Sequence, residues 1–137
     1  MKEGRWDRKK YAGVELYGKK LGVIGLGKIG REVAKRGIGF DMEILGYDPL
    51  LSKSLAGDLG IKLVELEDIY KNSDIITVHV PLTDDTRNLI STQEIKMCKD
   101  GVKIINCARG GIVDEQAVIE GIESGKISGA AFDVYNE

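Results

Sequence analysis

The sequence has few of the residues that build disulfide-linked or metal-stabilised folds. Its 137 residues include 2 cysteines, Cys98 and Cys107, and 1 histidine, His79. The cysteines show no metal-ligand spacing and no disulfide framework, so we expect free thiols, as in a reducing cytoplasm, and no bound metal. This scarcity argues against a small secreted scaffold and against a zinc site made of His and Cys.

Long apolar runs and blocks of like charge are also missing. There is no apolar stretch of roughly 18 residues and no signal-peptide or transit-peptide composition, which argues against a membrane span and predicts a cytoplasmic protein. The 20 Lys and Arg residues are scattered among 22 Asp and Glu residues, and the net charge is −2. Without a basic stripe, neither nucleic acid nor an anionic membrane is an expected partner.

Glycine, in contrast, is abundant. The 18 glycines are about twice the usual share, and they fall singly between short apolar runs, which is typical of an α/β protein. A chain of this length can bury roughly two thirds of its unfolded surface, so one domain is expected. We expect a lead-in over residues 1–17, helical or arm-like, followed by a cofactor-binding domain over residues 18–137.

Three of these glycines form a motif in the stretch Lys20–Gly30, KLGVIGLGKIG. Gly25, Gly27 and Gly30 follow a predicted strand and open a predicted helix, which is the context of the dinucleotide-binding fingerprint. In that motif the first glycine permits a tight turn, the second lets the backbone approach a pyrophosphate, and the third allows close helix–strand packing. The diphosphate then binds at the helix N-terminus. The alternative is a glycine-rich turn without a ligand.

An acidic residue supports the ligand-binding interpretation. Asp48 follows the predicted strand 43–47 and lies 18 residues beyond Gly30, near the ~20 expected for the acid that binds the adenosine ribose. Its carboxylate would repel a 2′-phosphate, and no arginine stands beside it, so NAD is favoured over NADP. The alternative is that Asp48 and Pro49 merely initiate a turn.

The rest of the chain alternates apolar strands with helical segments, which predicts βαβ units. We expect a doubly wound parallel sheet, the Rossmann fold, with about six or seven strands and helices on both faces. In the first helix, Ile29, Val33 and Ala34 are the predicted inner face. The further predicted strands are 43–47, 61–64, 74–80, 102–107 and 129–134, and the helices are 28–40, 51–59, 66–70, one capped by Ser91 and Glu94, and one capped by Asp114.

Three residues at predicted strand ends are candidates for chemistry. Arg109 lies between a strand and two glycines, where its guanidinium can hold a carboxylate or polarise a carbonyl, or else form a surface salt bridge. His79 is either an acid–base residue or a fixed residue of a pocket wall. Asp133 can accept a hydrogen bond from a carboxamide or cap a turn.

Five segments in order resemble the NAD-binding domain of the D-isomer-specific 2-hydroxyacid dehydrogenases: GVIGLGKIG, YDP, TVHVPLT, INCARGGIVDE and GAAFDVYNE. The lead-in MKEGRWDRKKYAGVEL is similar too, so the resemblance covers essentially the whole chain. It implies hydride transfer between NAD and a small 2-hydroxy acid, with Arg109 binding that substrate. It also implies a set of cofactor-binding residues: Gly25, Gly27, Lys28, Ile29, Gly30, Asp48, Val80, Cys107, Ala108 and Asp133.

The resemblance also indicates a catalytic set that extends beyond this sequence. Family members use an arginine, a glutamate and a histidine, of which the histidine exchanges a proton with the substrate hydroxyl. Glu137 resembles the residue one position before that glutamate, and His79 resembles a non-catalytic histidine. Family members also have a substrate domain. We therefore expect an excised domain that binds NAD and turns over little substrate.

Two further expectations follow from the family. Members usually dimerise through this domain, so we expect a homodimer in which the arm Trp6–Leu16 crosses to a partner; packing of Trp6 and Tyr11 on the same domain is the alternative. Rival functions are other family reductases, such as glyoxylate or hydroxypyruvate reductases, and NAD-sensing transcriptional corepressors, which share the domain and use NAD to control assembly.

Overall fold

The computed structural model describes residues 12–136. Trp6, Tyr11 and Glu137 therefore lie outside the described residues. Residues 12–17 of the lead-in contain no helix and end in a turn, so a helical form is not found in this part of it. No helix within residues 12–136 combines the length and the apolar character that crossing a membrane would need.

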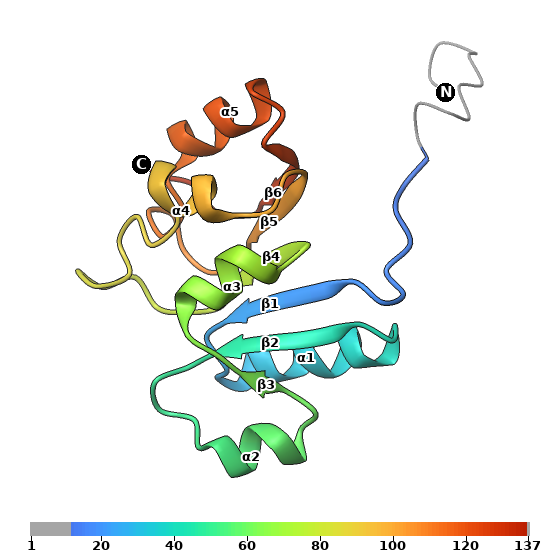
Figure 1. Cartoon of the computed structure of the whole chain (residues 1–137). Helices are drawn as coiled ribbons and strands as arrows, with labels where there is room; N and C mark the ends of the chain where they lie inside the picture. Colours follow the sequence, from blue (N-terminus) through green and yellow to red (C-terminus); the bar gives the residue numbers. More distant parts are fainter. Residues whose placement is uncertain (1–11, 137) are drawn as a thin grey trace.

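The strands form one sheet, in which every neighbouring pair is parallel. In chain order they are β1 (Lys20–Ile24), β2 (Glu43–Tyr47), β3 (Lys62–Leu63), β4 (Ile75–Val78), β5 (Val102–Asn106) and β6 (Ile127–Phe132). In space the six strands run β3-β2-β1-β4-β5-β6 (Figure 1). From β1 the chain adds β2 and β3 on one side and then β4, β5 and β6 on the other, so the strand order reverses between β1 and β4. Ligands of such sheets bind beyond the carboxyl ends of the strands at this reversal.

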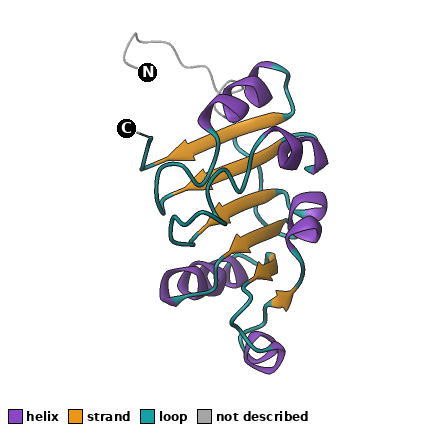
Figure 2. Ribbon diagram, turned by 90° about the vertical axis from the view of Figure 1, so that its left-hand side faces the viewer, coloured by secondary structure: helices purple, strands orange, loops and turns teal. Residues whose placement is uncertain are grey.

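Helices connect the strands and lie on both sides of the sheet (Figure 2). They are α1 (Lys28–Gly39), α2 (Lys53–Asp58), α3 (Leu66–Asn72), α4 (Thr92–Met97) and α5 (Glu115–Glu123). Because parallel crossovers are right-handed, the connections on the two sides of the reversal place their helices on opposite faces. The result is the doubly wound fold predicted from the sequence.

The two faces are held by separate hydrophobic clusters. Val23 and Ile44 of the sheet pack with Ala34 of α1 and with Ala56 of α2. Ile24 and Leu45, the next residues along the same two strands, face the other side of the sheet. The cluster there also includes Ile76, Val78 and Ile104 of the sheet, Ile69 of α3, Ile95 of α4 and Val118 of α5. Strands that are apolar on both faces are typical of a sheet covered from both sides.

The inner face of α1 agrees with the prediction at Ala34, which is buried, and at Val33, which packs against the core, but not at Ile29. Gly30, Ala34 and Gly37 are its buried residues, whereas Ile29 is 69% exposed and Val33 is half-buried. A Cβ added to Gly37 would lie 2.7 Å from Cδ1 of Ile44. The helix therefore approaches the sheet more closely at these small residues than larger ones would allow, and Val33 packs beside them.

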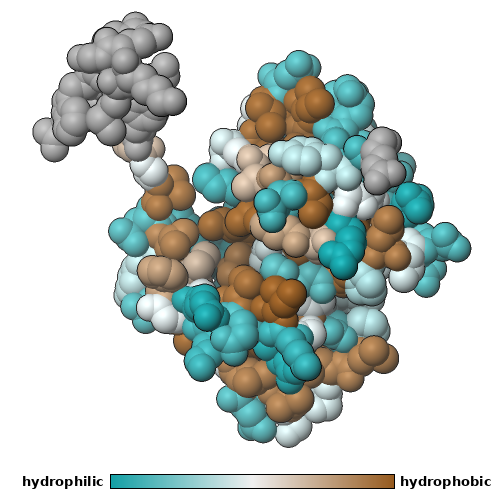
Figure 3. All heavy atoms as spheres, turned by 180° about the vertical axis from the view of Figure 1, so that it is seen from behind, coloured by the Kyte–Doolittle hydropathy of each residue, from teal (hydrophilic) through white to brown (hydrophobic). Residues whose placement is uncertain are grey.

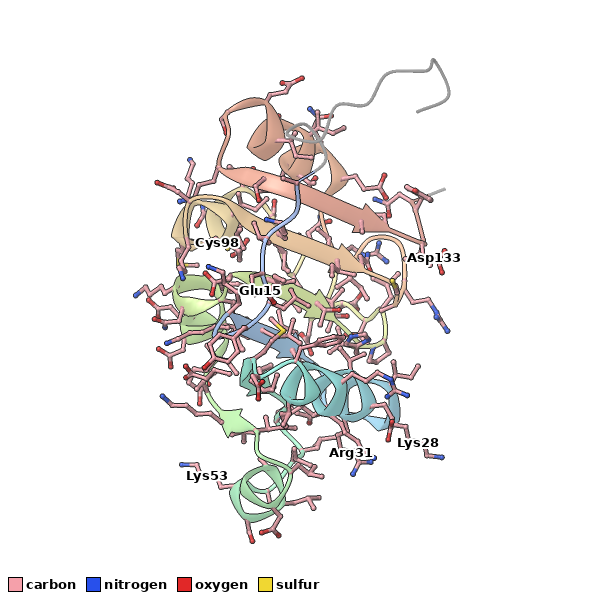
Figure 4. The ribbon with its side chains drawn as sticks, turned by 90° about the vertical axis from the view of Figure 1, so that its right-hand side faces the viewer. Glu15, Lys28, Arg31, Lys53, Cys98 and Asp133 are labelled. Carbon is pink, nitrogen blue, oxygen red and sulfur yellow. The ribbon has the colours of Figure 1, made fainter. Side chains whose placement is uncertain are left out.

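One side of β5 and β6 has no helix over it among the described residues. Figure 4 looks onto the side of the sheet that carries α1, and there β5 and β6 are crossed only by the segment that contains Glu15. Ile105 of β5 is half-buried and Ala131 of β6 is exposed. Apolar side chains also gather in the middle of the molecule when it is seen from behind (Figure 3).

Candidate functional site

The chain turns sharply where β1 ends. Gly25 has φ +92°, a backbone conformation that favours glycine. Its N–H donates to the carbonyl oxygen of Tyr47 over 2.8 Å, which ties the turn to the end of β2. A Cβ at this position would lie 2.6 Å from the carbonyl oxygen of His79, so both the turn and the neighbouring strand require a glycine here.

The other two glycines of the motif have different surroundings. A Cβ on Gly30 would lie 1.9 Å from the carbonyl oxygen of Gly25, whereas a Cβ on Gly27 would meet no atom within 4 Å. Close packing of helix and strand explains Gly30. Neither packing nor a positive φ explains Gly27, and its bare backbone faces open space at the start of α1. This is the place where a pyrophosphate would come close to the backbone.

The N-terminus of α1 is also left open to an anion. Gly27 is its N-cap, no side chain caps it, and its first turn contains no acidic residue. The first hydrogen bond of the helix runs from the N–H of Arg31 to the carbonyl of Gly27 (3.1 Å). The other described helices differ from α1 at their N-termini: Ser52 caps α2, acidic residues stand in the first turn of α3, a capping box begins α4, and Asp114 caps α5. The free N–H groups and the helix dipole of α1 therefore suit a phosphate.

Asp48 lies beside this turn at the end of β2. Its Oδ2 accepts the N–H of Leu26 (2.8 Å) and its Oδ1 accepts the N–H of Leu50 (2.8 Å). An ionised carboxylate can accept about four hydrogen bonds, so lone pairs remain on both oxygens. The half-buried Asp48 can therefore also accept ribose hydroxyls. The structure thus brings the three glycines and the acid together, as the sequence predicted.

A hollow of about 600 Å³ opens next to the turn, between the start of α1 and the ends of β4 and β5. Five of the predicted site residues line it, from three separate segments of the chain. The complete lining is Ile29, His79, Val80, Pro81, Leu82, Cys107, Ala108 and Arg109. Its position at the reversal of strand order, beside a phosphate-binding turn, makes it the candidate site for the rest of a dinucleotide.

Arg109 is exposed and follows β5 at the rim of this hollow. Its Nη1 donates to the carbonyl of Ala108 (2.7 Å). The loop is shaped by Asn106, which is 1% exposed: its Nδ2 donates to the carbonyl of Arg109 (2.9 Å) and its Oδ1 accepts the N–H of Ala108 (3.1 Å). Sequence reasoning missed Asn106. The available signal was an asparagine at the end of a β-branched run, a residue that commonly bonds to the backbone of a following turn.

His79 forms part of the wall of the hollow. Its Nε2 lies 2.9 Å from Oγ1 of Thr77, and its backbone N–H donates to the carbonyl of Ile24 (2.7 Å). Burial lowers the pKa of His79, which favours the neutral form of the ring. These contacts favour the fixed pocket-wall residue over the acid–base residue.

The two thiols are free and differ in their surroundings. Cys98 is buried in the core, and burial raises its pKa to about 11, so this thiol stays protonated. Cys107 is exposed and lines the hollow. Only Cys107 is therefore placed to touch a ligand there.

Asp133 is the predicted site residue farthest along the chain. It is exposed, and its N–H donates to the carbonyl of Asn106 (3.0 Å). Asp133 is not among the residues that line the hollow, although Figure 4 shows it and Lys28 at the same end of the molecule, beyond the carboxyl ends of the strands. The predicted contact of Asp133 with a ligand carboxamide therefore requires a ligand that extends across the ends of β4 and β5.

A second hollow, of about 610 Å³, lies between α4 and α5. It contains none of the predicted site residues and no helix N-terminus without a cap. The first hollow, which is lined by predicted site residues, is therefore the candidate site.

Comparison with known proteins gives the same assignment. Residues 1–137 match the family described as "D-isomer specific 2-hydroxyacid dehydrogenase, NAD binding domain". The chain is 50% identical over 138 residues to D-3-phosphoglycerate dehydrogenase of Methanocaldococcus jannaschii, and 52% identical over 137 residues to that of Archaeoglobus fulgidus. Each match covers 100% of this chain and 26% of the relative. The chain thus spans about a quarter of the length of these relatives.

Solved structures share the fold. D-lactate dehydrogenase from Aquifex aeolicus, complexed with NAD and lactic acid, matches with a TM-score of 0.90 and 38% identity, over 99% of this chain and 40% of that chain. A glyoxylate reductase from Paecilomyes thermophila matches with a TM-score of 0.91 and 37% identity, over 99% of this chain and 41% of that chain. With the uncapped α1, the glycine turn and Asp48, these matches show that the chain belongs to the NAD-binding domain family of the D-isomer-specific 2-hydroxyacid dehydrogenases.

Proposed function

We propose that this chain is the NAD-binding domain of a D-3-phosphoglycerate dehydrogenase. The observation that carries the proposal is the identity of about half of all residues to proteins of that name, over the whole chain. The parent reaction is the oxidation of 3-phosphoglycerate to 3-phosphohydroxypyruvate, the first step of serine biosynthesis. The compartment is the cytoplasm, in keeping with the two free thiols.

The geometry supports a division of roles among the site residues. The N–H groups of Lys28 and Ile29, at the open start of α1, bind the pyrophosphate. Asp48 accepts the adenosine ribose hydroxyls and selects against a 2′-phosphate. NAD, when bound, supplies the acceptor for the substrate's hydride. The residues that line the cofactor site toward the nicotinamide are Val80, Cys107, Ala108 and Asp133; at Val80 the contact is through the backbone.

Arg109 is the proposed catalytic residue of this chain. Its exposed guanidinium at the rim of the hollow can bind a substrate carboxylate through paired hydrogen bonds and polarise the carbonyl that forms. Asn106 fixes the backbone of Arg109 and so sets where the side chain starts. Arg109 donates hydrogen bonds, but its guanidinium stays protonated and cannot take up a proton at neutral pH. The proton of the substrate hydroxyl therefore needs another group.

We expect this polypeptide to bind NAD and to turn over little substrate. His79, the one histidine of the sequence, is engaged by Thr77, and general acid–base help is typically worth 10²–10⁴ in rate. A steady-state assay with 3-phosphoglycerate and NAD tests this expectation. Turnover near that of an intact dehydrogenase would contradict it and would point to an acid–base group within these 137 residues.

Other members of the family remain the main alternative. The fold is about as similar to a glyoxylate reductase as to a D-lactate dehydrogenase, and it does not separate their substrates, because the cofactor domain is shared and substrate choice is made largely by the substrate domain. Assays of the full-length parent with 3-phosphoglycerate, glyoxylate, hydroxypyruvate and D-lactate separate these functions. An NAD-sensing corepressor would show NAD-dependent assembly and no turnover with any of them.

We also infer that the domain forms a homodimer in the parent protein, with the segment Trp6–Leu16 crossing to the partner. The side of β5 and β6 without a covering helix supports this inference. The exposed side chains of Val14 and Tyr17, 56% and 71% accessible, lie in or next to the proposed arm and add apolar surface. A second copy of the chain would cover such surface.

A further inference from the structure

We propose that Asp48 is a positioning residue for the phosphate-binding turn, in addition to its proposed contact with the ribose. The carboxylate holds the glycine turn in its binding conformation before any ligand arrives. The inference rests on the proposed function, because it concerns how the same site recognises NAD. It differs in assigning Asp48 an effect on ligands that have no ribose hydroxyls to offer.

The turn between β1 and α1 is held to the end of β2 by two hydrogen bonds. One runs between backbone groups, from the N–H of Gly25 to the carbonyl of Tyr47 (2.8 Å). The other runs from the N–H of Leu26 to Oδ2 of Asp48 (2.8 Å), and this is the bond that involves a side chain. The negative charge of a carboxylate makes such a bond stronger than one between neutral groups.

The carboxylate is itself fixed from the other side. Its Oδ1 accepts the N–H of Leu50 (2.8 Å), in a turn that starts at Asp48, where the N–H of Leu51 also reaches the carbonyl of Asp48 (3.4 Å). Asp48 therefore cannot swing away without losing two hydrogen bonds. Its orientation is set by the end of β2 and is imposed on the glycine turn.

The position of Leu26 makes this contact consequential. Leu26 lies between Gly25 and Gly27, its side chain is 2% exposed, and a Cβ added to Gly46 of β2 would lie 2.7 Å from its Cδ1. Leu26 is thus held by its side chain in the core and by its N–H on Asp48. The next residues, Gly27 and Lys28, begin the helix whose free N–H groups face the phosphate.

A consequence is that the two halves of the cofactor site are coupled. If Asp48 only bound the ribose, its removal would lower the affinity for a ligand according to the ribose hydroxyls that the ligand carries. If it also positions the turn, its removal weakens phosphate binding even where those hydroxyls are missing. The two cases differ for ADP from which the 2′- and 3′-hydroxyls have been removed.

The test uses the chain itself and the variants Asp48→Ala and Glu43→Ala. Glu43 is the matched control: it is a carboxylate of the same strand, at the opposite end, 3.5 Å from the ammonium of Lys20. Calorimetric titration measures the affinities of ADP and of 2′,3′-dideoxy-ADP. NMR hydrogen exchange of the Leu26 amide is measured without ligand. Asp48→Asn, which keeps one acceptor oxygen, takes the place of Asp48→Ala if the latter does not fold.

We expect Asp48→Ala to weaken 2′,3′-dideoxy-ADP roughly tenfold, the loss expected for one hydrogen bond to a charged group, and to speed exchange of the Leu26 amide by a similar factor. Glu43→Ala changes neither. Unchanged dideoxy-ADP affinity, or unchanged Leu26 exchange, overturns the proposal. If the unmodified chain binds neither ADP nor NAD, the proposed function fails, while the exchange measurement still decides whether Asp48 holds the turn.

Discussion

At the scale of single residues, the three glycines of the turn have three different surroundings. Gly25 is fixed by its positive φ and by the carbonyl of His79, and Gly30 by the carbonyl of Gly25. Gly27 has a negative φ, −65°, and open space where a side chain would lie. Contacts within the protein therefore explain Gly25 and Gly30, whereas the open space at Gly27 fits the proposed pyrophosphate.

This difference predicts opposite results for two alanine variants. Gly30→Ala forces a Cβ against backbone and should lower the free energy of unfolding by about 2–3 kcal/mol. Gly27→Ala should change the free energy of unfolding by about 1 kcal/mol or less, since only the N-cap preference is affected. The same variant should weaken the binding of NAD roughly tenfold, because the methyl group fills the space of the pyrophosphate. Urea unfolding and calorimetric titration measure the two quantities. Unchanged NAD affinity in Gly27→Ala would argue against the pyrophosphate position.

At the scale of elements, Asp74 joins strands at the amino end of the sheet, far from the proposed cofactor. Its Oδ2 accepts the N–H of Lys20 (2.8 Å) and its Oδ1 contacts the ammonium of Lys99. Its carbonyl accepts the N–H of Lys103 (3.0 Å). Burial raises the pKa of Asp74, but the hydrogen bonds from Lys20 and Lys99 and the charge of Lys99 outweigh it and hold that pKa below its ordinary value.

The depressed pKa predicts how stability changes with pH. A carboxyl group whose pKa is lower in the folded state stabilises the fold above its unfolded pKa, about 3.9, and loses this contribution as the pH falls through the folded pKa. Asp74→Asn should therefore lower the free energy of unfolding at pH 7 by about 1 kcal/mol, and the difference from the original chain should shrink below about pH 4. Urea unfolding across that range checks this. An equal difference at pH 7 and pH 3 would mean that the charge of Asp74 contributes nothing.

The order and type of the elements could be predicted because hydrophobic periodicity and the positions of turn-forming glycine and proline residues are local properties of the sequence. Strand ends could not, since they depend on partners. The strand predicted to reach Val80 ends at Val78, where its neighbour β1 ends at Ile24 and turns. The face of α1 was predicted at Ile29, Val33 and Ala34, of which Ile29 is exposed. Its buried positions also include Gly30 and Gly37, which hydrophobic spacing overlooks.

The candidate site divides in the same way. The glycines and Asp48 were predictable because a phosphate-binding turn and a ribose acceptor lie at a fixed spacing in the chain. Asn106 was not, because its role depends on the shape of the loop that carries Ala108 and Arg109. The bond between Leu26 and Asp48 joins residues of two strand ends, and only the folded sheet places them together.

At the scale of the whole molecule, the helices are divided between the two sides of the sheet. α1 and α2 pack on one side, α3, α4 and α5 on the other, and β5 and β6 lack a helix on the side of α1 within residues 12–136. This arrangement leaves the ends of β1, β4 and β5 accessible to a dinucleotide, and it leaves apolar surface for a neighbouring chain or domain.

The proposed homodimer predicts the mass of the chain in solution. Sedimentation at increasing concentration should show a species of twice the chain mass of 15.0 kDa, because a second copy would bury the surface beside β5 and β6. A negative charge introduced at Ile105 (Ile105→Glu) should shift the distribution toward monomer. A strict monomer at high concentration would contradict dimerisation through this domain.

The turn at Gly25–Gly30 and the carboxylate of Asp48 are proposed to bind NAD together. Calorimetric titration of this chain with NAD and then with NADP tests this proposal most directly. We expect saturable binding of NAD, with binding of NADP weaker by roughly tenfold or more because its 2′-phosphate meets the carboxylate of Asp48. Equal affinity for the two dinucleotides, or no binding of NAD, would contradict it.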